Sequence, residues 1–371
     1  MRTRSAIVRA VPGKWEVVEL DLDEPGPGEV LVRLVAAGLC HSDDHIATGD
    51  LPVRTLPMAG GHEGAGVVEA VGPEVHDLAV GDHVVFTYLP VCGRCRWCSN
   101  GLQGLCDMGA GTLHGSRPGD PTSYRLHLGD VPVGQGSCVG TFSERTTVDR
   151  RSVVKIDKDI PLESAALVGC GVLTGWGAAV NSGGTRPGDV VICMGIGGIG
   201  INAVQGAAHA GAGHVIAVDP VEFKRAKALE LGATAAFADM AQARDHARSL
   251  TNGQGADVAV VTVGITTGEH VAEAFASIRK AGTVVVVGLG PRSDRGIPVS
   301  IDELVLYQKR IQGSLFGSAA PLADIPRALE FYRTGQLKLD ELITTRYTLD
   351  EIGQGYDDMH AGRNLRGVIV F

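Results

Sequence analysis

The chain has 371 residues, which is too long for one small hydrophobic core and suits two domains. Its net charge of −9 disfavours nucleic acid and anionic membranes as partners, because both select basic surfaces. The N-terminal stretch "MRTRSAIVRAVPGKW" lacks the apolar run of a signal peptide, so we expect a cytoplasmic protein.

The first 171 residues predict a mainly-β domain. Short runs rich in β-branched residues and bounded by turn residues are typical of strands, as in "GEVLVRLVAAG" at 28–38 and "GAGVVEAVG" at 64–72. The segment 108–140 is rich in Gly, Pro and Ser, and this composition predicts a long loop.

A loop at about 90–107 concentrates cysteine. It holds Cys92, Cys95, Cys98 and Cys106. A reducing compartment disfavours disulfides, and a redox pair needs only two thiols. The spacing Cys-x2-Cys-x2-Cys-x7-Cys favours a closed tetrahedral zinc site that stabilises the fold. Four thiolates also hold iron–sulfur clusters, and ferredoxin spacings are similar, so the loop alone leaves both metals open.

From 172 to 312 the pattern alternates between strands and helices. Strands are expected at "DVVICMG", "HVIAVD", "DVAVVTVG" and "GTVVVVGLG", with helices such as "EFKRAKALELGA" and "MAQARDHARSLTNG" between them. This alternation predicts an α/β fold with a doubly wound parallel sheet. The run at 190–218 has the length of a membrane span, but its Gly clusters and polar residues favour strand, turn, helix and strand.

The motif Gly195-x-Gly197-x-x-Gly200 follows the first of these strands and opens a helix. Such a turn lets the backbone approach a pyrophosphate, and the helix N-terminus supplies donors. Asp219 closes the next strand, where an acidic side chain binds ribose hydroxyls and repels a 2′-phosphate. The pattern favours NAD, although the basic pair at 224–225 leaves NADP open. The predicted cofactor residues of this segment are Gly195, Gly197, Gly198, Gly200, Asp219 and Lys224.

A second set of metal-binding residue types is spread over the first half of the chain. It lies in "GLCHSDDH" at 38–45, "GGHEGAG" at 60–66 and "LVGCGVLTGWG" at 167–177. A lone cysteine is usually a core residue, and we keep that interpretation for Cys138 and Cys193. The last segment, 313–371, ends in "LRGVIVF", a strand that could return to the first domain.

These motifs, the four-cysteine loop and the glycine motif occur together and in order. The chain resembles the zinc-dependent medium-chain alcohol dehydrogenases over essentially its whole length. The resemblance implies a GroES-like catalytic domain at 1–171, a Rossmann NAD-binding domain at 172–312 and a return to the first domain at 313–371. The stretches "VQGAAHAGA", "VDPVEFKRAKALELGAT" and "LRGVIVF" are similar to an actinobacterial subgroup that holds NAD tightly and is assayed with N,N-dimethyl-4-nitrosoaniline.

The same resemblance implies two zinc ions per subunit. A catalytic zinc binds Cys40, His62 and Cys170, with water or substrate oxygen in the fourth position, and a structural zinc binds the four-cysteine loop. Glu63 neighbours the catalytic metal, and Asp43 orients His62, as a ligating histidine generally requires.

The resemblance also implies a proton relay. Ser42 takes the hydrogen bond from the alcohol, and the nicotinamide ribose passes the proton to His45, because histidine titrates near neutral pH. His41 stands where relatives often carry arginine against the pyrophosphate, and imidazole should hold phosphate less firmly. Arg366 matches another pyrophosphate contact and Tyr88 a pocket-lining aromatic. The expected reaction is the reversible oxidation of a small primary alcohol to its aldehyde by hydride transfer to NAD.

Two other functions remain open. A thiol-dependent formaldehyde dehydrogenase of the same family would oxidise an S-hydroxymethyl thiol, and Arg117 and Arg125 are candidate ligands for the thiol's carboxylates. A non-catalytic zinc- and nucleotide-binding sensor is the other, although a sensor has no need of the relay residues. The family pairs subunits through strands near 298–313 here, so we expect a homodimer or tetramer. A trapped NAD would further require an unidentified electron acceptor.

Overall fold

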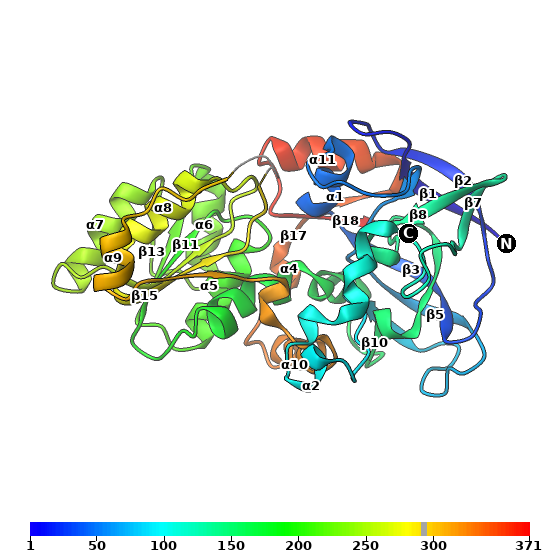
Figure 1. Ribbon diagram of the computed structural model, residues 1–371, viewed down its shortest axis with the longest axis horizontal. Coiled ribbons are helices and arrows are strands. Elements are labelled where there is room, and N and C mark those ends of the chain that lie inside the picture. Colours follow the sequence, from blue (N-terminus) through cyan, green and yellow to red (C-terminus); the bar gives the residue numbers. More distant parts are fainter. Residues whose placement is uncertain (291–294) are drawn as a thin grey trace. The chain divides into compact units, whose positions relative to one another are not determined.

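The structure, a computed structural model, describes residues 1–290 and 295–371. The chain divides into two compact units (Figure 1): unit 1 is Met1–Cys170 with Ala320–Phe371, and unit 2 is Gly171–Ala319. The return to unit 1 therefore begins at Ala320 instead of 313. The reason is that the turn at 316–318 still packs within unit 2, where the carbonyl of Gly317 accepts a hydrogen bond from Asn181.

Unit 1 contains a closed five-stranded barrel. Around the barrel the strands are β1 (Arg2–Val8), β2 (Glu16–Leu22), β7 (Leu126–Leu128), β8 (Val131–Gln135) and β4 (Met58–Ala59). Ile7, Leu20 and Leu126 are among the apolar side chains that form its core.

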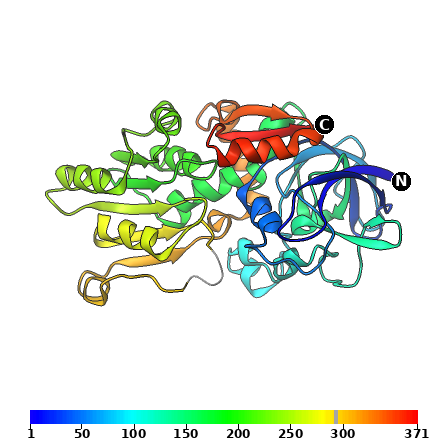
Figure 2. The same cartoon turned by 90° about the horizontal axis from the view of Figure 1, so that it is seen from above.

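A second sheet of unit 1 carries the predicted strands at 28–38 and 64–72. Its strand order is β10 (Val153–Ile156), β6 (His83–Phe86), β5 (Ala65–Val71), β3 (Glu29–Gly38), β18 (Arg366–Val370) and β17 (Ile343–Tyr347), with β9 (Arg145–Asp149) also paired to β3. The C-terminal strand β18 is antiparallel to β3, and Figure 2 shows this red segment beside the blue N-terminal strands. The C-terminal strand thus joins a sheet whose other strands come mostly from the first half of the chain.

Short helices complete unit 1. They are α1 (His41–Thr48), α2 (Arg96–Ser99), α3 (Leu162–Ala166), α10 (Pro321–Arg333) and α11 (Ile352–His360). Helix α11 lies beside α1 (Figure 1), and the hydroxyl of Tyr356 donates to the carbonyl of Cys40. The C-terminal segment therefore supports the helix that follows β3.

The segment 108–140 corrects the sequence prediction of a long loop. It contains a 3₁₀ stretch at Asp107–His114 and the hairpin of β7 and β8, which is part of the barrel. A tight turn at 129–130 joins the two strands, with Gly129 at φ 59°. The strands are so short that their alternation is hidden among turn residues, and only pairing with β2 and β4 stabilises them.

Unit 2 confirms the predicted doubly wound parallel sheet. Its strand order is β13 (Ala235–Phe237), β12 (His214–Val218), β11 (Val190–Met194), β14 (Ala256–Val261), β15 (Ile278–Val286) and β16 (Arg310–Gly313). All neighbours are parallel, and numbering from β11 gives the order 3-2-1-4-5-6 of dinucleotide-binding folds.

Helices cover this sheet. They are α4 (Gly171–Gly177), α5 (Gly200–His209), α6 (Glu222–Glu230), α7 (Met240–Leu250), α8 (Gly268–Ser277) and α9 (Ile301–Leu306). Met240 of α7 and Phe275 of α8 pack in one core cluster with Ile192 of β11. Helix α5 buries Ile201 and Val204 outside that cluster and lies against β11 and β12.

The uncharged run at 190–218 forms β11, α5 and β12, as the sequence predicts. Within the described residues no single helix has the length and apolar character to cross a bilayer. The bent pair Leu162–Gly169 and Gly171–Ser182 meets those criteria only when its two parts are counted together.

Candidate active site and metal centres

Unit 1 brings together four potential metal ligands from three separate segments. Cys40 lies between β3 and α1, His62 and Glu63 lie between β4 and β5, and Cys170 ends a 3₁₀ turn. One ligand atom from each lies within 4.8 Å of the others, and all four residues are buried. We call this group the mixed cluster. Two thiols and an imidazole are the donor set of catalytic zinc sites.

A buried carboxylate orients the imidazole of the mixed cluster. Oδ2 of Asp43 lies 2.9 Å from Nδ1 of His62, and Oδ1 accepts a hydrogen bond of 2.9 Å from the amide of Gly61. This arrangement leaves Nε2 of His62 for a metal. Burial lowers the pKa of His62, but the charges of Asp43 and Cys40 outweigh it and the pKa lies well above its ordinary value.

The two thiols of the mixed cluster share a hydrogen bond. That bond holds the pKa of Cys40 well below its ordinary value, and together with burial it raises the pKa of Cys170. Cys40 is therefore the thiol of the pair that loses its proton first. A divalent cation would replace the shared proton and bind both sulfurs, which is the usual coupling of metal binding to deprotonation.

Glu63 and Arg366 form a buried ion pair beside the two thiols. Nη2 of Arg366 donates to Oε2 of Glu63, and Arg366 is only 4% exposed. Burial raises the pKa of Glu63 to about 7. The sequence predicted Arg366 as a pyrophosphate contact, whereas within unit 1 its guanidinium binds Glu63.

Helix α1 carries the predicted relay residues. Oγ of Ser42 lies 3.6 Å from the sulfur of Cys40, and the side chain of His45 is 8% exposed. The ring of His41 lies 6.4 Å from that of His45 and 6.3 Å from that of His360 on α11. Sequence reasoning missed His360, whose partner Asp44 is more than 300 positions away in the chain. No local pattern marks such a contact.

An aromatic ring lies against the mixed cluster. Tyr88, the predicted pocket-lining residue, contacts the ring of His62 edge-on, with 5.4 Å between centroids.

The two arginines considered as ligands for a thiol's carboxylates form ion pairs within the protein instead. Arg125 is 1% exposed and Arg117 is 30% exposed, and both bind Glu29. This contact gives no support to the thiol-dependent alternative.

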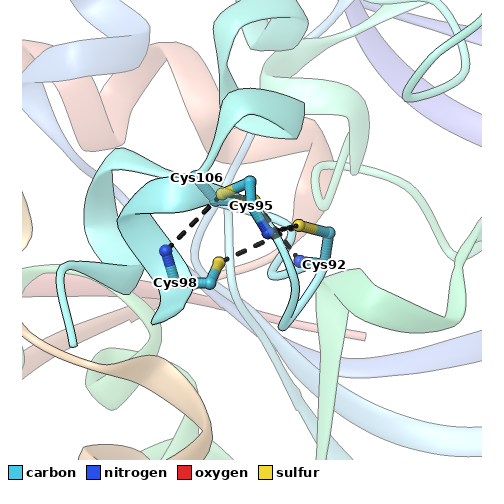
Figure 3. A group of neighbouring side chains, drawn as sticks. All are labelled: Cys92, Cys95, Cys98 and Cys106. Carbon is cyan, nitrogen blue, oxygen red and sulfur yellow. Dashed lines mark hydrogen bonds between the residues drawn. The ribbon is translucent and has the colours of Figure 1, made fainter. Parts of the chain in front are cut away.

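The four-cysteine loop forms a second cluster (Figure 3). Its ligand atoms lie within 4.8 Å of one another. The sulfur pairs Cys92–Cys98 and Cys95–Cys106 lie 3.9 and 4.0 Å apart. All eight cysteines of the chain are free thiols, so none of these pairs is a disulfide. A tetrahedral ion with bonds of ~2.3 Å to sulfur places its thiolates about 3.8 Å apart. The spacing fits one ion, because a multi-iron cluster would hold its thiolates farther apart.

Backbone amides favour the thiolate form in this cluster. The amides of Arg94 and Cys95 lower the pKa of Cys92 to about 6, and the amide of Cys98 lowers that of Cys95. Burial raises the pKa of Cys98 to about 12. The more exposed cysteines of the loop, Cys92 and Cys95, therefore lose their protons readily. The buried thiol of Cys98 needs a bound cation to become a thiolate.

Unit 2 places the glycine motif at the carboxyl end of β11, where the strand order reverses. Gly195 has φ 90°, and a Cβ on Gly200 would lie 1.8 Å from the carbonyl of Gly195. A Cβ on Gly197 would meet no atom within 4 Å, so packing does not explain this glycine. A ligand phosphate approaching the N-terminus of α5 does explain it.

An acidic residue stands beside that turn. The carboxylate of Asp219 accepts hydrogen bonds of 2.8 Å from the amide of Ile196 and 2.9 Å from that of Val221. Arg225 uses Nη1 to bind the carbonyls of Asp219 and Pro220, each at 2.8 Å. Lys224 lies on the first turn of α6, and Gly198 lies between the other glycines.

Two family profiles match the chain. The alcohol dehydrogenase GroES-like domain matches residues 26–158, and the zinc-binding dehydrogenase profile matches residues 198–334. The NDMA-dependent alcohol dehydrogenase of Amycolatopsis methanolica is 52% identical over 370 residues, covering 100% of this chain and 99% of that protein.

Two solved structures resemble the chain over its length. The alcohol dehydrogenase zinc-binding domain protein of Burkholderia ambifaria has a TM-score of 0.91 at 33% identity, covering 100% of this chain and 99% of that one. Benzyl alcohol dehydrogenase of Acinetobacter calcoaceticus has a TM-score of 0.89 at 30% identity, with the same coverage of 100% and 99%.

Proposed function

Because the chain belongs to the zinc-dependent alcohol dehydrogenases, enzymes that oxidise alcohols with zinc and a nucleotide cofactor, we propose that this enzyme uses NAD and keeps it bound between turnovers. The substrate we propose is a small primary alcohol, which it converts reversibly to the aldehyde. The similarity to the NDMA-dependent enzyme, 52% identical over the full chain, carries the proposal of a trapped cofactor.

Two zinc sites per chain are part of the proposal. The mixed cluster fits a catalytic ion, since Cys40, His62 and Cys170 offer sulfur, nitrogen and sulfur while Glu63 is engaged by Arg366. Zinc bound there supplies Lewis acidity that lowers the pKa of an alcohol hydroxyl. The four-cysteine cluster fits a closed structural ion, because all four of its donors are thiols.

The chain's own residues then handle the proton and the charge. Asp43 keeps His62 in the orientation described above. Ser42 accepts the hydrogen bond of the alcohol, and His45 receives the proton and releases it to solvent. Bound NAD supplies the hydride acceptor. His41 and Arg366 are proposed to contact its pyrophosphate.

NAD in preference to NADP is supported by Asp219. Its carboxylate charge opposes a 2′-phosphate, and the nearby Arg225 already donates to two backbone carbonyls. The binding turn is proposed to use Gly195, Gly197 and Gly200, with Lys224 near the adenosine ribose.

The cofactor proposal predicts a specific assay result. Purified enzyme should bleach the nitroso acceptor with alcohol and no added NAD, while forming little free NADH from added NAD. Denaturation should release about one NAD per chain, identified by mass. Robust NADH formation that depends wholly on added NAD would mean an ordinary dissociating dehydrogenase, and release of NADP would contradict the role of Asp219.

We also propose a homodimer formed through unit 2. Helix α9 exposes Ile301 (68%), Val305 (63%) and Leu306 (74%) to solvent, next to the edge strand β16. Apolar side chains gathered at an unpaired sheet edge favour association.

The dimer proposal predicts that Leu306→Glu yields monomers. Burying a charge among the apolar side chains of α9 should cost more free energy than dimerisation provides. Light scattering after gel filtration measures the mass of the particle. Val80→Glu is the matched control, since Val80 is 66% exposed and belongs to unit 1 instead of unit 2. Unchanged mass in Leu306→Glu would place the interface elsewhere.

A further inference from the structure

The end of helix α1 joins the relay histidine to a carboxylate that reaches solvent. Nδ1 of His45 lies 3.4 Å from Oδ2 of Asp50. The His45 side chain is 8% exposed and the Asp50 side chain is 40% exposed. A proton on the buried ring of His45 is therefore one hydrogen bond away from a carboxylate that contacts solvent.

The backbone holds Asp50 in that place. Gly49 ends α1 in the left-handed region, with φ 89° and ψ 4°, and turns the chain back across the last helical turn. The amide of Leu51 then donates to the carbonyl of His45 over 2.8 Å. Thr48 donates to Oδ2 of Asp50 over 2.8 Å, which orients the carboxylate toward the ring.

The titratable groups near His45 that the structure describes lie on α1, on the turn that follows it, and on α11. His41 on the same helix lies 6.4 Å away between ring centroids, and His360 of α11 contacts His41 while binding Asp44. Elements packed against the far side of α1 contribute apolar residues, including Val8, Met58 and Trp15. Hydrogen bonds from Thr48 and His45 lower the pKa of Asp50, so this group is a carboxylate at neutral pH.

We propose that Asp50 is a positioning residue of the proton relay: it accepts Nδ1–H of His45 and so fixes the tautomer in which Nε2 takes the proton that comes from the alcohol. When Nε2 gains that proton, the ring becomes an imidazolium that the carboxylate stabilises. The Nδ1 proton then leaves to water at the exposed edge of Asp50, and a shift of tautomer restores the ring. One proton enters and one leaves, so the step balances. The inference rests on the proposed function.

The test is the rate of the first turnover as a function of pH. NADH formation is followed by stopped flow after alcohol is mixed with the NAD-loaded enzyme, from about pH 6 to about pH 10, a range that spans histidine titration. Asp50→Asn should lower the rate near neutral pH about 10-fold, which is less than the roughly 100-fold or more expected for a group that transfers the proton itself. Its inflection should move to lower pH, because the imidazolium loses its stabilising charge. Asp50→Glu should recover about half of the wild-type rate.

Matched variants separate this role from a structural one. Asp23→Asn removes a carboxylate that also lies 3.4 Å from a histidine, His127, and should leave the profile unchanged. In a His45→Ala background, Asp50→Asn should cause no further loss. Thr48→Val should shift the profile in the same direction, and it serves if Asp50→Asn folds poorly.

Each outcome has one meaning. Superimposable profiles for wild type, Asp50→Asn and Thr48→Val would overturn the role of Asp50 while the alcohol dehydrogenase stands. A lower melting temperature with an unmoved inflection would make Asp50 structural. Absence of alcohol-dependent NADH formation in the wild-type enzyme would instead be a failure of the proposed function.

Discussion

Cys40→Ala should abolish alcohol oxidation while leaving the chain folded. Its thiol is one of the three proposed zinc ligands of the mixed cluster, and the chemistry depends on a bound Lewis acid. We expect turnover to fall about a thousandfold or more, and metal analysis to give about one zinc per chain instead of two. The circular dichroism spectrum should match that of the wild type, because the substitution removes only the sulfur of one buried side chain.

The matched control for this variant is Cys193→Ala. Cys193 is fully buried in β11, outside both clusters, and burial raises its pKa to about 12. The control therefore removes a buried thiol without removing a ligand, and it should keep both zinc ions and most of the turnover. Wild-type turnover in Cys40→Ala would show that the catalytic zinc is assigned to the wrong residues.

Cys95→Ala should lower stability before it affects chemistry. Its thiol lies in the four-cysteine cluster, and a structural metal adds its binding energy to folding. Losing one of the four ligands should lower the melting temperature by several degrees, roughly 5–10 °C. Thermal melts and aggregation measured by light scattering check this, while turnover per folded chain at low temperature should stay near that of wild type.

Cys138→Ala is the control for the structural site. Cys138 is also buried in unit 1, where its thiol donates to the carbonyl of Gly111 instead of facing the other cysteines. The control should keep two zinc ions and melt close to wild type. A normal melt for Cys95→Ala, with the same metal content, would rule out a structural ion at this cluster.

Local patterns were sufficient for the four inner strands of the sheet of unit 2, whereas its edge strands β13 and β16 were not predicted from them. Strands β11, β12 and β14 and the second half of β15 are largely apolar and buried, and each is recognisable without knowledge of its neighbours. The turn at Gly195 and the acidic residue Asp219 follow from the same short-range geometry.

Elements that depend on contacts with distant parts of the chain were predicted less well. The composition of 108–140 predicts a loop, whereas residues 126–135 form a hairpin, because strands this short are stable only within a barrel. The boundary at Ala320 was missed because the turn at 316–318 is held by Asn181, far away in sequence. Neither contact can be recognised from the residues that flank it in the sequence.

The sequence by itself determined the family, the two unit types and the residues able to bind metal and nucleotide, because those depend on residue type and short spacing. Only the tertiary structure decided which of those residues meet. It joined Glu63 to Arg366 and His41 to His360, and it turned Asp50 back onto His45. Contacts across such separations are set by the packing of sheets and helices, which acts over the whole chain and has no local period.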